Sequence, residues 1–311
     1  MKFGVIGLGA MGKNHARIYA ELGLLGAVCD LHGPTAVAAG ATYGVTAFSD
    51  LDAFLRSPLG GASIAVPTPL HREVALKCFQ AGLNVLLEKP MSDTLESARL
   101  IDAEAKGAGK ILAVGYIERY NPAFRALQTL VDGGVFGELT SVNIRRVGGE
   151  PRSTDNIVLD LMTHDFDLLM ALFGRKPEKI TTHAHESGGV VNSAQALLDF
   201  GTASATCEAN WISPIKIRRI QLTGTAGYCD VDLIKKEIVK IDAGFNGTDT
   251  PVKGFSTNHH QELFTFTQEP LKEQLVAFAK AVAENSSAGL VTGEDGLRVL
   301  ELTLQAIREA T

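Results

Sequence analysis

Short apolar runs alternate with helix-like segments along the first third of the chain. The runs are typical of buried strands, and the segments between them have apolar residues every three to four positions, as amphipathic helices do. Strands separated by single helices imply β-α-β units and a parallel sheet that is covered on both faces. We therefore predict a doubly wound α/β domain here. Its predicted strands are 2–7, 26–30, 61–67, 84–89 and 111–116, and its predicted helices are 14–22, 32–44, 69–82 and 95–109.

The pattern changes after residue 120. A helix-like segment (122–134) leads to a strand (139–147) and then to a strongly apolar helix near residues 156–173. Further strand candidates follow with little helix between them, which predicts a mostly antiparallel, open sheet. We predict two domains, residues 1–120 and an α+β substrate-binding and oligomerisation domain of residues 121–311, whose last helix can pack back on the first domain. The later elements are strands 179–185, 193–200, 203–211, 217–224, 228–233 and 237–242, and helices 269–285 and 293–310.

Bulk composition agrees with two globular domains. A chain of 311 residues exceeds the usual size of a single core, and 45% hydrophobic with 21% charged residues is typical of a globular protein rather than a disordered or fibrous one. The net charge is −6, from 29 basic and 35 acidic side chains. Because no block of Lys or Arg stands out, nothing indicates binding to nucleic acid or to an anionic membrane. We expect a small-molecule partner.

Signals for the cellular compartment are few. The apolar N-terminus lacks a signal-peptide cleavage site and runs directly into a glycine loop, so it is interpreted as a first strand. No run approaches the roughly 20 apolar residues that span a bilayer. The four cysteines show neither a CxxC pair nor a zinc spacing. We predict a cytoplasmic protein with buried free thiols.

A glycine-rich loop follows the first predicted strand. Its sequence GLGAMG allows a tight turn and lets backbone N–H groups approach a pyrophosphate at the N-terminus of the next helix. Asp30 ends the second predicted strand, where a carboxylate can accept hydrogen bonds from ribose hydroxyls. Its charge would repel a 2′-phosphate and no arginine lies beside it, so NAD is predicted rather than NADP. The domain is therefore predicted to be an NAD-binding Rossmann domain. The predicted loop contacts are Gly7, Gly9, Ala10, Met11 and Gly12.

A polar stripe interrupts the apolar helix at residues 158–169. At about 100° per residue, Asp160, Thr163, His164 and Asp167 share one face, and buried polar groups need partners or a cavity. Asp160 lies one helical turn before His164 and can hold the imidazole in one tautomer. A satisfied structural histidine is one alternative, and a metal site of Asp160, His164 and Asp167 is another. Hydride transfer to NAD requires no metal and no further His cluster points to one, so no metal is predicted.

Four segments together carry a family resemblance: GLGAMG, residues 69–90 ending in Glu-Lys-Pro, DLMTHDFDLL at 160–169 and LTGTAGY at 222–228. They resemble the Gfo/Idh/MocA family of NAD(P)-dependent sugar and polyol dehydrogenases over nearly the whole chain. The resemblance implies an NAD(P)-dependent oxidoreductase that acts on CH–OH groups. In the family the lysine of Glu-Lys-Pro and the Asp/His pair form the catalytic group, which maps onto Lys89, Asp160 and His164. The bond between Lys89 and Pro90 is often cis in relatives.

The resemblance also implies contacts at two other strand ends. Glu88 would contact the ribose or carboxamide region of the cofactor, with an ion pair to a neighbouring base as the alternative. His71, with Pro67 and Thr68 in the turn before it, would cover the cofactor, with a structural role at a helix N-terminus as the alternative. Lys89 would lie over the nicotinamide and contact both cofactor and substrate, because doubly wound sheets bind ligands at the carboxyl ends of their strands.

These roles imply a mechanism of hydride transfer. His164 would accept the hydroxyl proton of the substrate while the carbon-bound hydrogen leaves as hydride. Lys89 would stabilise the developing alkoxide, and Asp160 would orient His164. A catalytically silent NAD-binding regulator is an alternative from another class, and the presence of all three side chains argues against it.

The substrate is suggested by residues 115–127 and 143–152. They are similar to the branch of the family that oxidises nucleotide-activated amino sugars, notably UDP-N-acetylglucosamine at C3. Arginines there could bind a diphosphate, but neighbouring strand residues face opposite sides, so Arg145 and Arg146 cannot both serve. Residues 148–155 contain fewer apolar residues and prolines than is typical of that branch, so a free sugar or inositol is an alternative substrate. The predicted substrate contacts are Lys89, Tyr120, Asn121, Arg146, Arg152, Asp160 and His164, and Arg119 and Arg145 are further candidates for the diphosphate.

The open sheet of the second domain suggests self-association. Apolar residues occupy both alternating faces in 193–200 and 203–211, which would leave one face uncovered in a monomer. We therefore predict a homodimer or homotetramer. Trp211 could stack on a sugar ring, but packing in the sheet or a subunit contact is favoured.

Overall fold

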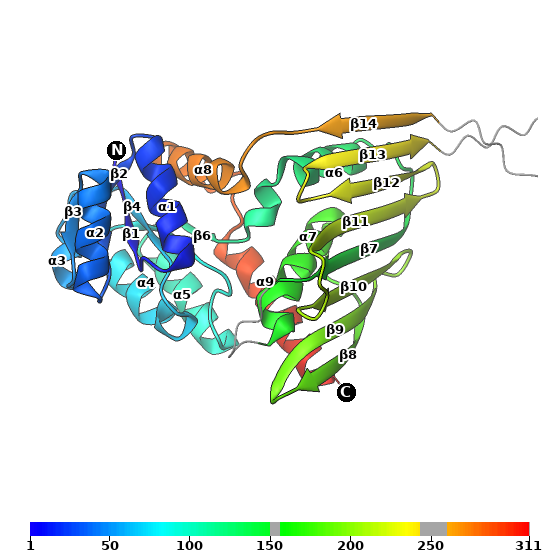
Figure 1. The fold of residues 1–311 in the computed structure, drawn as a ribbon, viewed down its shortest axis with the longest axis horizontal. Helices are drawn as coiled ribbons and strands as arrows, with labels where there is room; N and C mark the ends of the chain where they lie inside the picture. The colour runs from blue at the N-terminus through cyan, green and yellow to red at the C-terminus, as the bar shows by residue number, and fades with distance from the viewer. Residues whose placement is uncertain (150–155, 243–259, 311) are drawn as a thin grey trace, which may run out of the picture. The chain divides into compact units, whose positions relative to one another are not determined.

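The chain forms two compact units in its computed structural model, which describes residues 1–149, 156–242 and 260–310 (Figure 1). The first unit comprises Met1–Ile117 and Glu269–Glu301, and the second comprises Glu118–Gln268 and the chain from Leu302 onward. Residues 269–301, assigned by the sequence pattern to the second domain, thus belong to the first unit. The reason is packing, because the buried apolar face of helix 270–284 joins the core around the first strand and the first helix.

The sheet of the first unit is parallel throughout, in the order β3-β2-β1-β4-β5-β6. Every residue of β1 and β4 is buried, as expected for strands covered on both faces. The order reverses between β1 and β4, and the crevice at such a point is where doubly wound sheets bind ligands. The predicted Rossmann domain is confirmed. Its strands are β1 (Phe3–Ile6), β2 (Leu25–Cys29), β3 (Thr46–Phe48), β4 (Gly61–Ile64), β5 (Asn84–Leu87) and β6 (Leu112–Val114).

The helices of the first unit differ in how they begin. Asp50 and Thr94 cap α3 and α5 by accepting backbone N–H groups, whereas α1 begins after Gly9 without a side-chain cap. An uncapped helix start leaves backbone N–H groups free to bind a ligand.

No helix in the described residues is long and apolar enough to cross a membrane. The helices are α1 (Ala10–Glu21), α2 (Gly33–Tyr43), α3 (Leu51–Leu55), α4 (His71–Gln80), α5 (Leu95–Gly107), α8 (Pro270–Glu284) and α9 (Gly293–Glu309), the last divided between the units at Glu301.

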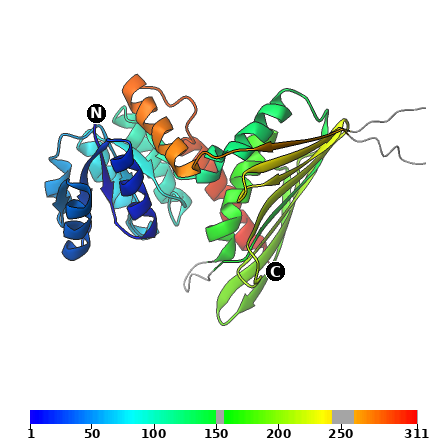
Figure 2. The same cartoon turned by 45° about the horizontal axis from the view of Figure 1, so that its top comes forward.

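The second unit is built on a sheet in the order β14-β13-β12-β11-β7-β10-β9-β8. Among the described strands of this second sheet only β7 and β10 pair in parallel, so the predicted mostly antiparallel sheet is confirmed. Helices α6 (Pro122–Asp132) and α7 (Thr163–Phe173) cover one face (Figure 2). The strands are β7 (Leu139–Val147), β8 (Lys179–Ser187), β9 (Val190–Asp199), β10 (Ser204–Asn210), β11 (Ile217–Gly224), β12 (Gly227–Asp232), β13 (Glu237–Asp242) and β14 (Gln261–Thr265).

The two faces of this sheet differ in chemistry, and the expectation of apolar residues on both faces was wrong. The inward residues of β9 and β10 are buried alanines, leucine and cysteine, whereas their outward neighbours are mostly polar. Arg145 pairs with Glu208 on the outward face, where Leu197 is the exposed apolar residue of β9. Trp211 is buried, as packing in the sheet requires. The period-two pattern of a half-buried strand therefore holds after all.

The four cysteines are buried and free, as the sequence predicted. Burial raises the pKa of Cys29 to about 11 and the pKa values of Cys78 and Cys229 to about 12. Burial also raises the pKa of Cys207. Because the thiolate is the reactive form of cysteine, these thiols serve packing rather than chemistry.

Candidate active site

The three glycines of the first loop differ in their backbone conformation and in what a Cβ at each would meet. Gly7 has a φ of 85°, a conformation that residues with a side chain rarely adopt. A Cβ at Gly12 would overlap the carbonyl oxygen of Gly7, so only glycine lets α1 start so close to β1. A Cβ at Gly9 would meet nothing within 4 Å, so the space in front of the uncapped start of α1 is open. Such an opening fits a pyrophosphate group.

Asp30 lies beside this loop, directly after β2. Its Oδ2 accepts the backbone N–H of Leu8 at 2.7 Å, and its Oδ1 accepts the backbone N–H of His32 at 2.8 Å. The carboxylate is therefore fixed at the strand end, next to the glycine loop. A ribose held by Asp30 and a pyrophosphate at Gly9 are what a dinucleotide such as NAD requires, so the residues present fit this cofactor.

His71 joins the loops that follow β4 and β5. It is buried, with Nδ1 3.0 Å from the carbonyl oxygen of Pro90 and Nε2 3.0 Å from that of Val66. Burial lowers its pKa, although these carbonyl groups partly oppose the effect. Pro67 and Thr68 form the turn between β4 and His71. The imidazole thus holds the protein's own backbone at the first position of α4, as in the structural role left open for it.

Glu88 and Lys89 follow β5 directly. The predicted cis bond between Lys89 and Pro90 is confirmed. Glu88 is buried and its Oε1 lies 3.0 Å from Nε2 of His15, so its partner is a neighbouring base, as in the alternative that the sequence left open. Its Oε2 accepts the backbone N–H of Lys89 at 3.3 Å. The sequence did not single out His15; its one signal was a histidine among the buried positions of α1.

Asp160 and His164 lie in the second unit, in a helix that is not regular. Val158–Met162 form a π-helical turn, and α7 starts at Thr163. The sequence predicted one straight α-helix, but a π turn inserts a residue and changes the angles between side chains; such turns are frequent at functional sites. Asp160 and His164 are 7% and 8% exposed, so both polar groups lie in a largely dry environment. Electrostatic interactions there are stronger than in water.

Two groups of buried ion pairs hold the helix that carries His164. Asp167 is bound by Arg119 twice, Nε to Oδ2 and Nη2 to Oδ1, each at 2.9 Å. Arg146 donates from Nε to Asp165 at 2.6 Å and from Nη1 to Glu118 at 2.8 Å. Burial opposes the charge on Arg146, but Asp165 and Glu118 outweigh it and raise its pKa. Burial raises the pKa of Asp165 to about 6, against the lowering effect of Arg146.

These pairs change what the sequence suggested for three side chains. The possible metal site of Asp160, His164 and Asp167 already has a cation in place, because Asp167 binds Arg119 at both oxygens. The guanidinium groups of Arg119 and Arg146 are engaged by carboxylates inside the unit. Neither arginine is therefore proposed as a diphosphate ligand.

Tyr120 and Asn121 also lie inside the second unit. Tyr120 is 1% exposed, and the guanidinium carbon of Arg125 lies 4.8 Å from the centre of its ring. Asn121 caps α6 by accepting the N–H of Ala123 at 3.1 Å, and it donates to the carbonyl of Leu233 at 2.9 Å. Both side chains contact other residues of the same unit, so neither is proposed as a sugar contact. The remaining predicted contact, Arg152, lies outside the described residues.

Comparison with known proteins decides the family. Residues 1–116 match an oxidoreductase family with an NAD-binding Rossmann fold, and residues 124–230 match the GFO/IDH/MocA C-terminal domain. The chain is 30% identical to UDP-N-acetylglucosamine 3-dehydrogenase of Acidithiobacillus ferrooxidans, over 98% of this chain and 96% of that protein. The chain belongs to the Gfo/Idh/MocA family.

Other Gfo/Idh/MocA relatives show the range of substrates. A solved structure of the Acidithiobacillus ferrooxidans enzyme has a TM-score of 0.88 at 28% identity, covering 100% of this chain and 97% of that one. Inositol 2-dehydrogenase of Rhizobium meliloti is 25% identical over 99% of this chain and 96% of that protein. Levoglucosan dehydrogenase in complex with NADH and levoglucosan shares the fold, with a TM-score of 0.89 at 18% identity over 100% of this chain and 97% of that one. This Gfo/Idh/MocA chain is therefore an NAD-binding oxidoreductase for a sugar-type substrate.

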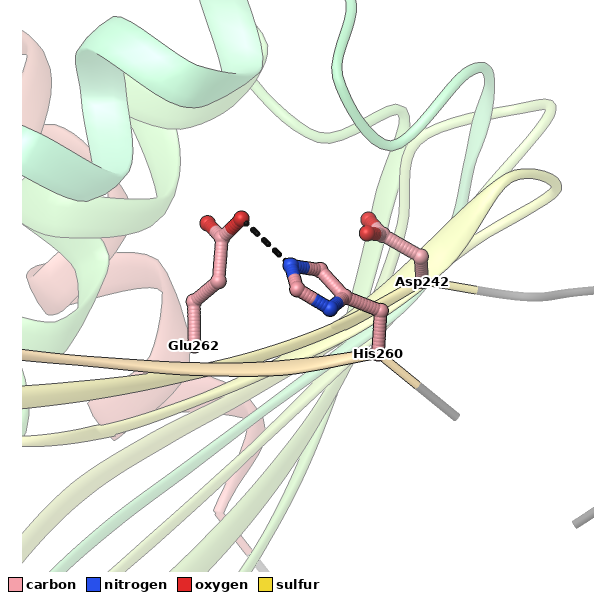
Figure 3. Close-up of side chains that lie close together, drawn as sticks. All are labelled: Asp242, His260 and Glu262. Atoms are coloured by element: carbon pink, nitrogen blue, oxygen red, sulfur yellow. Dashed lines mark hydrogen bonds and ion pairs between the residues drawn. The ribbon is translucent and has the colours of Figure 1, made fainter. Parts of the chain in front are cut away.

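Elsewhere in this Gfo/Idh/MocA chain, three possible metal ligands gather at the ends of β13 and β14 (Figure 3). Donor atoms of Asp242, His260 and Glu262 lie within 4.8 Å of one another, and His260 is 3.0 Å from Glu262. The ammonium group of Lys240 lies 3.1 Å from Asp242 and 3.3 Å from Glu262. Because the ammonium group of Lys240 already pairs with both carboxylates, we interpret this cluster as an ion-pair network.

Proposed function

We propose that this chain is an NAD-dependent dehydrogenase that oxidises a secondary hydroxyl of a UDP-amino sugar, such as UDP-N-acetylglucosamine at C3. The observation that carries the reaction type is the shared sheet edge of Gly9, Asp30 and Lys89, which follow β1, β2 and β5 at the carboxyl ends of parallel strands. Support for the substrate comes from the end-to-end similarity to UDP-N-acetylglucosamine 3-dehydrogenase.

The proposed mechanism gives each catalytic side chain one task. His164 accepts the proton of the substrate hydroxyl as general base, and Asp160 orients its imidazole. Lys89 donates a hydrogen bond to the same oxygen and stabilises the alkoxide that develops there. Bound NAD supplies the acceptor for the hydride that leaves the carbon. Lys89 belongs to the first unit, and Asp160 and His164 belong to the second.

An inositol or free-sugar dehydrogenase of the same family is the second candidate. The observation that favours it is the engagement of Arg119 and Arg146 by buried carboxylates, which removes them from diphosphate binding. A neutral polyol needs no such cation. A catalytically silent NAD-binding regulator is the third candidate, and it has no use for Lys89 or His164.

One assay separates the three candidates. NADH formation is followed with UDP-N-acetylglucosamine, UDP-glucose, glucose and myo-inositol in parallel, with NADP as a cofactor control. Turnover confined to the UDP-amino sugar supports the proposal, and turnover of glucose or myo-inositol selects the second candidate. NADH binding without turnover selects the regulator. Lys89→Met and His164→Asn should each lower kcat by about 100-fold or more while NADH binding persists.

We also propose a homodimer or homotetramer in the cytoplasm. The outward face of the second sheet carries the pairs Arg145 with Glu208 and Arg219 with Asp230, so a contact between copies there would be largely polar. Elution from a size-exclusion column as a monomer would contradict this part of the proposal.

A further inference from the structure

His15 connects the cofactor loop with the segment that carries Lys89. It lies in α1, the helix that starts directly after the open position at Gly9, and it is fully buried. Its Nε2 lies 3.0 Å from Oε1 of Glu88, a residue 73 positions away in the sequence. Glu88 follows β5, which is two strands from β1 in the sheet. The pair therefore crosses the edge at which the cofactor is expected.

Glu88 is fixed on several sides. Its backbone N–H bonds the carbonyl of Ile64 at 3.0 Å, so the residue stays in register with β4. A Cβ at Gly115 would lie 3.0 Å from the Cα and the carboxyl group of Glu88, so the chain after β6 packs directly against it. The Oε2 atom turns back to the backbone N–H of Lys89 at 3.3 Å. The carboxylate cannot turn toward another donor without breaking this packing.

The hydrogen-bonding capacity of His15 indicates its role in the pair. Its Nδ1 is buried and has no hydrogen-bond partner among the described residues. A carboxylate accepts hydrogen bonds and cannot donate them, so the hydrogen between Nε2 of His15 and Oε1 of Glu88 must belong to the imidazole. The arrangement is therefore best satisfied when Nε2 carries the hydrogen and donates to Glu88. A buried carboxylate needs such a donor.

We propose that His15 is a positioning residue for Lys89, acting through the carboxylate of Glu88. The proposal rests on the function proposed above. Glu88 holds the backbone amide on the N-terminal side of Lys89, while His71 holds the carbonyl of Pro90 on the other side. With both flanks fixed, the lysine side chain leaves the strand end in a defined direction. His15 ties that direction to α1, the helix whose uncapped start is the expected pyrophosphate site.

The test compares two polar substitutions of similar size. In His15→Gln the side-chain N–H reaches the position of Nε2, whereas in His15→Asn it stops near Nδ1 and cannot reach Glu88. We expect His15→Asn to lower kcat by about 10- to 100-fold, as loss of an orienting contact does elsewhere, with KM and the NADH dissociation constant changed less than about threefold. His15→Gln should recover most of kcat. Equal kcat values in the two variants would overturn the proposal.

Tyr19→Phe is the matched control. Tyr19 lies on the same helix, is fully buried, and contacts Ser63 through its hydroxyl at 3.2 Å without touching Glu88. The Tyr19→Phe variant should keep kcat within about twofold of the wild type. A fall in kcat as large as that of His15→Asn would mean that losing any buried hydrogen bond of α1 slows the enzyme, and it would overturn the proposal.

A second readout does not depend on turnover. The rate at which trinitrobenzenesulfonate labels Lys89, followed by peptide mass spectrometry, reports the placement of its amine. We expect a changed rate in His15→Asn and a wild-type rate in His15→Gln and Tyr19→Phe. If no sugar is oxidised by the wild type, the proposed function fails but this labelling still decides: an unchanged rate in His15→Asn overturns the positioning role.

Discussion

Gly9→Ala should separate NAD binding from folding. The backbone of Gly9 is extended, with φ −67° and ψ −161°, which alanine adopts without strain, and the new Cβ would meet nothing within 4 Å. Replacing glycine reduces the freedom of the unfolded chain and stabilises the fold by about 0.4 to 1 kcal/mol. Alanine is a poorer residue than glycine at a helix start, which costs roughly the same amount. The free energy of unfolding should therefore change by less than about 1 kcal/mol.

The effect on NADH should be much larger. The new methyl group occupies the open space through which a pyrophosphate reaches the first N–H groups of α1. Loss of one hydrogen bond to a charged group costs about 1.5 to 3 kcal/mol, which corresponds to about 10- to 150-fold in the dissociation constant. Fluorescence titration with NADH measures this constant, and chemical denaturation measures stability in the same variant.

Two further glycines provide the controls for this experiment. Gly107, at the end of α5, also has open space around a Cβ, so Gly107→Ala should leave NADH binding near its wild-type value and stabilise the fold by up to about 1 kcal/mol. Gly12→Ala should lose stability by about 1 to 3 kcal/mol, because its Cβ would overlap the backbone of Gly7. If Gly9→Ala binds NADH as tightly as Gly107→Ala does, the pyrophosphate does not pass Gly9 and the assignment of this loop is wrong.

Three other predictions concern charged side chains. Asp30→Ala should raise the ratio of NADPH to NADH affinity by about 10-fold or more, since it removes the charge that repels a 2′-phosphate; an unchanged ratio in fluorescence titrations would show that Asp30 does not face that position. Arg119→Met should lower the free energy of unfolding by about 3 kcal/mol, because it leaves the buried carboxylate of Asp167 without its partner. Arg145→Met breaks an exposed pair and should lower it by less than about 1 kcal/mol, so equal urea midpoints for the two variants would contradict this prediction. The pKa of Asp165 is raised to about 6, against 3.8 in the unfolded chain, so its protonation contributes stability that is complete below about pH 4 and is lost as the pH rises through about 6. Asp165→Asn should therefore flatten the fall in melting temperature between these pH values. Parallel curves of melting temperature against pH for the wild type and the variant would refute this.

Local sequence signals were sufficient for most strands and helices of the first unit and for the chemistry of its loop. The strands of a parallel sheet are buried on both faces, so β1, β4 and β5 appear as continuous apolar runs. The glycine loop depends on backbone geometry that only glycine allows, and this too is visible in the sequence. The elements that the pattern did not predict include a three-residue strand (β3), a five-residue helix (α3) and a largely exposed edge strand (β14). None of them is long or apolar enough to show a periodicity.

Charge pairing could not be predicted in the same way. His15 meets Glu88 across 73 residues, and Arg119 meets Asp167 across 48, and no spacing rule connects positions so far apart. The guanidinium group of Arg119 therefore suggested phosphate binding, whereas its partner is the buried carboxylate of Asp167. Asn121 is different, because Asn followed by Pro122 at the first position of α6 is the usual signal of a helix cap. That local signal indicates the structural role better than the resemblance did.

The balance of charge around α7 bears on which substrate fits. Arg119 and Arg146 are matched by Glu118, Asp165 and Asp167, and Asp160 adds a further carboxylate to the same helix. A diphosphate needs cations that are not already neutralised, so a UDP-sugar would have to find them outside this network. A polyol needs only hydrogen-bonding groups such as Lys89 and His164. The overall similarity to a UDP-sugar enzyme and the local charge balance thus favour different substrates, and this is why UDP-N-acetylglucosamine and myo-inositol must be compared in one assay.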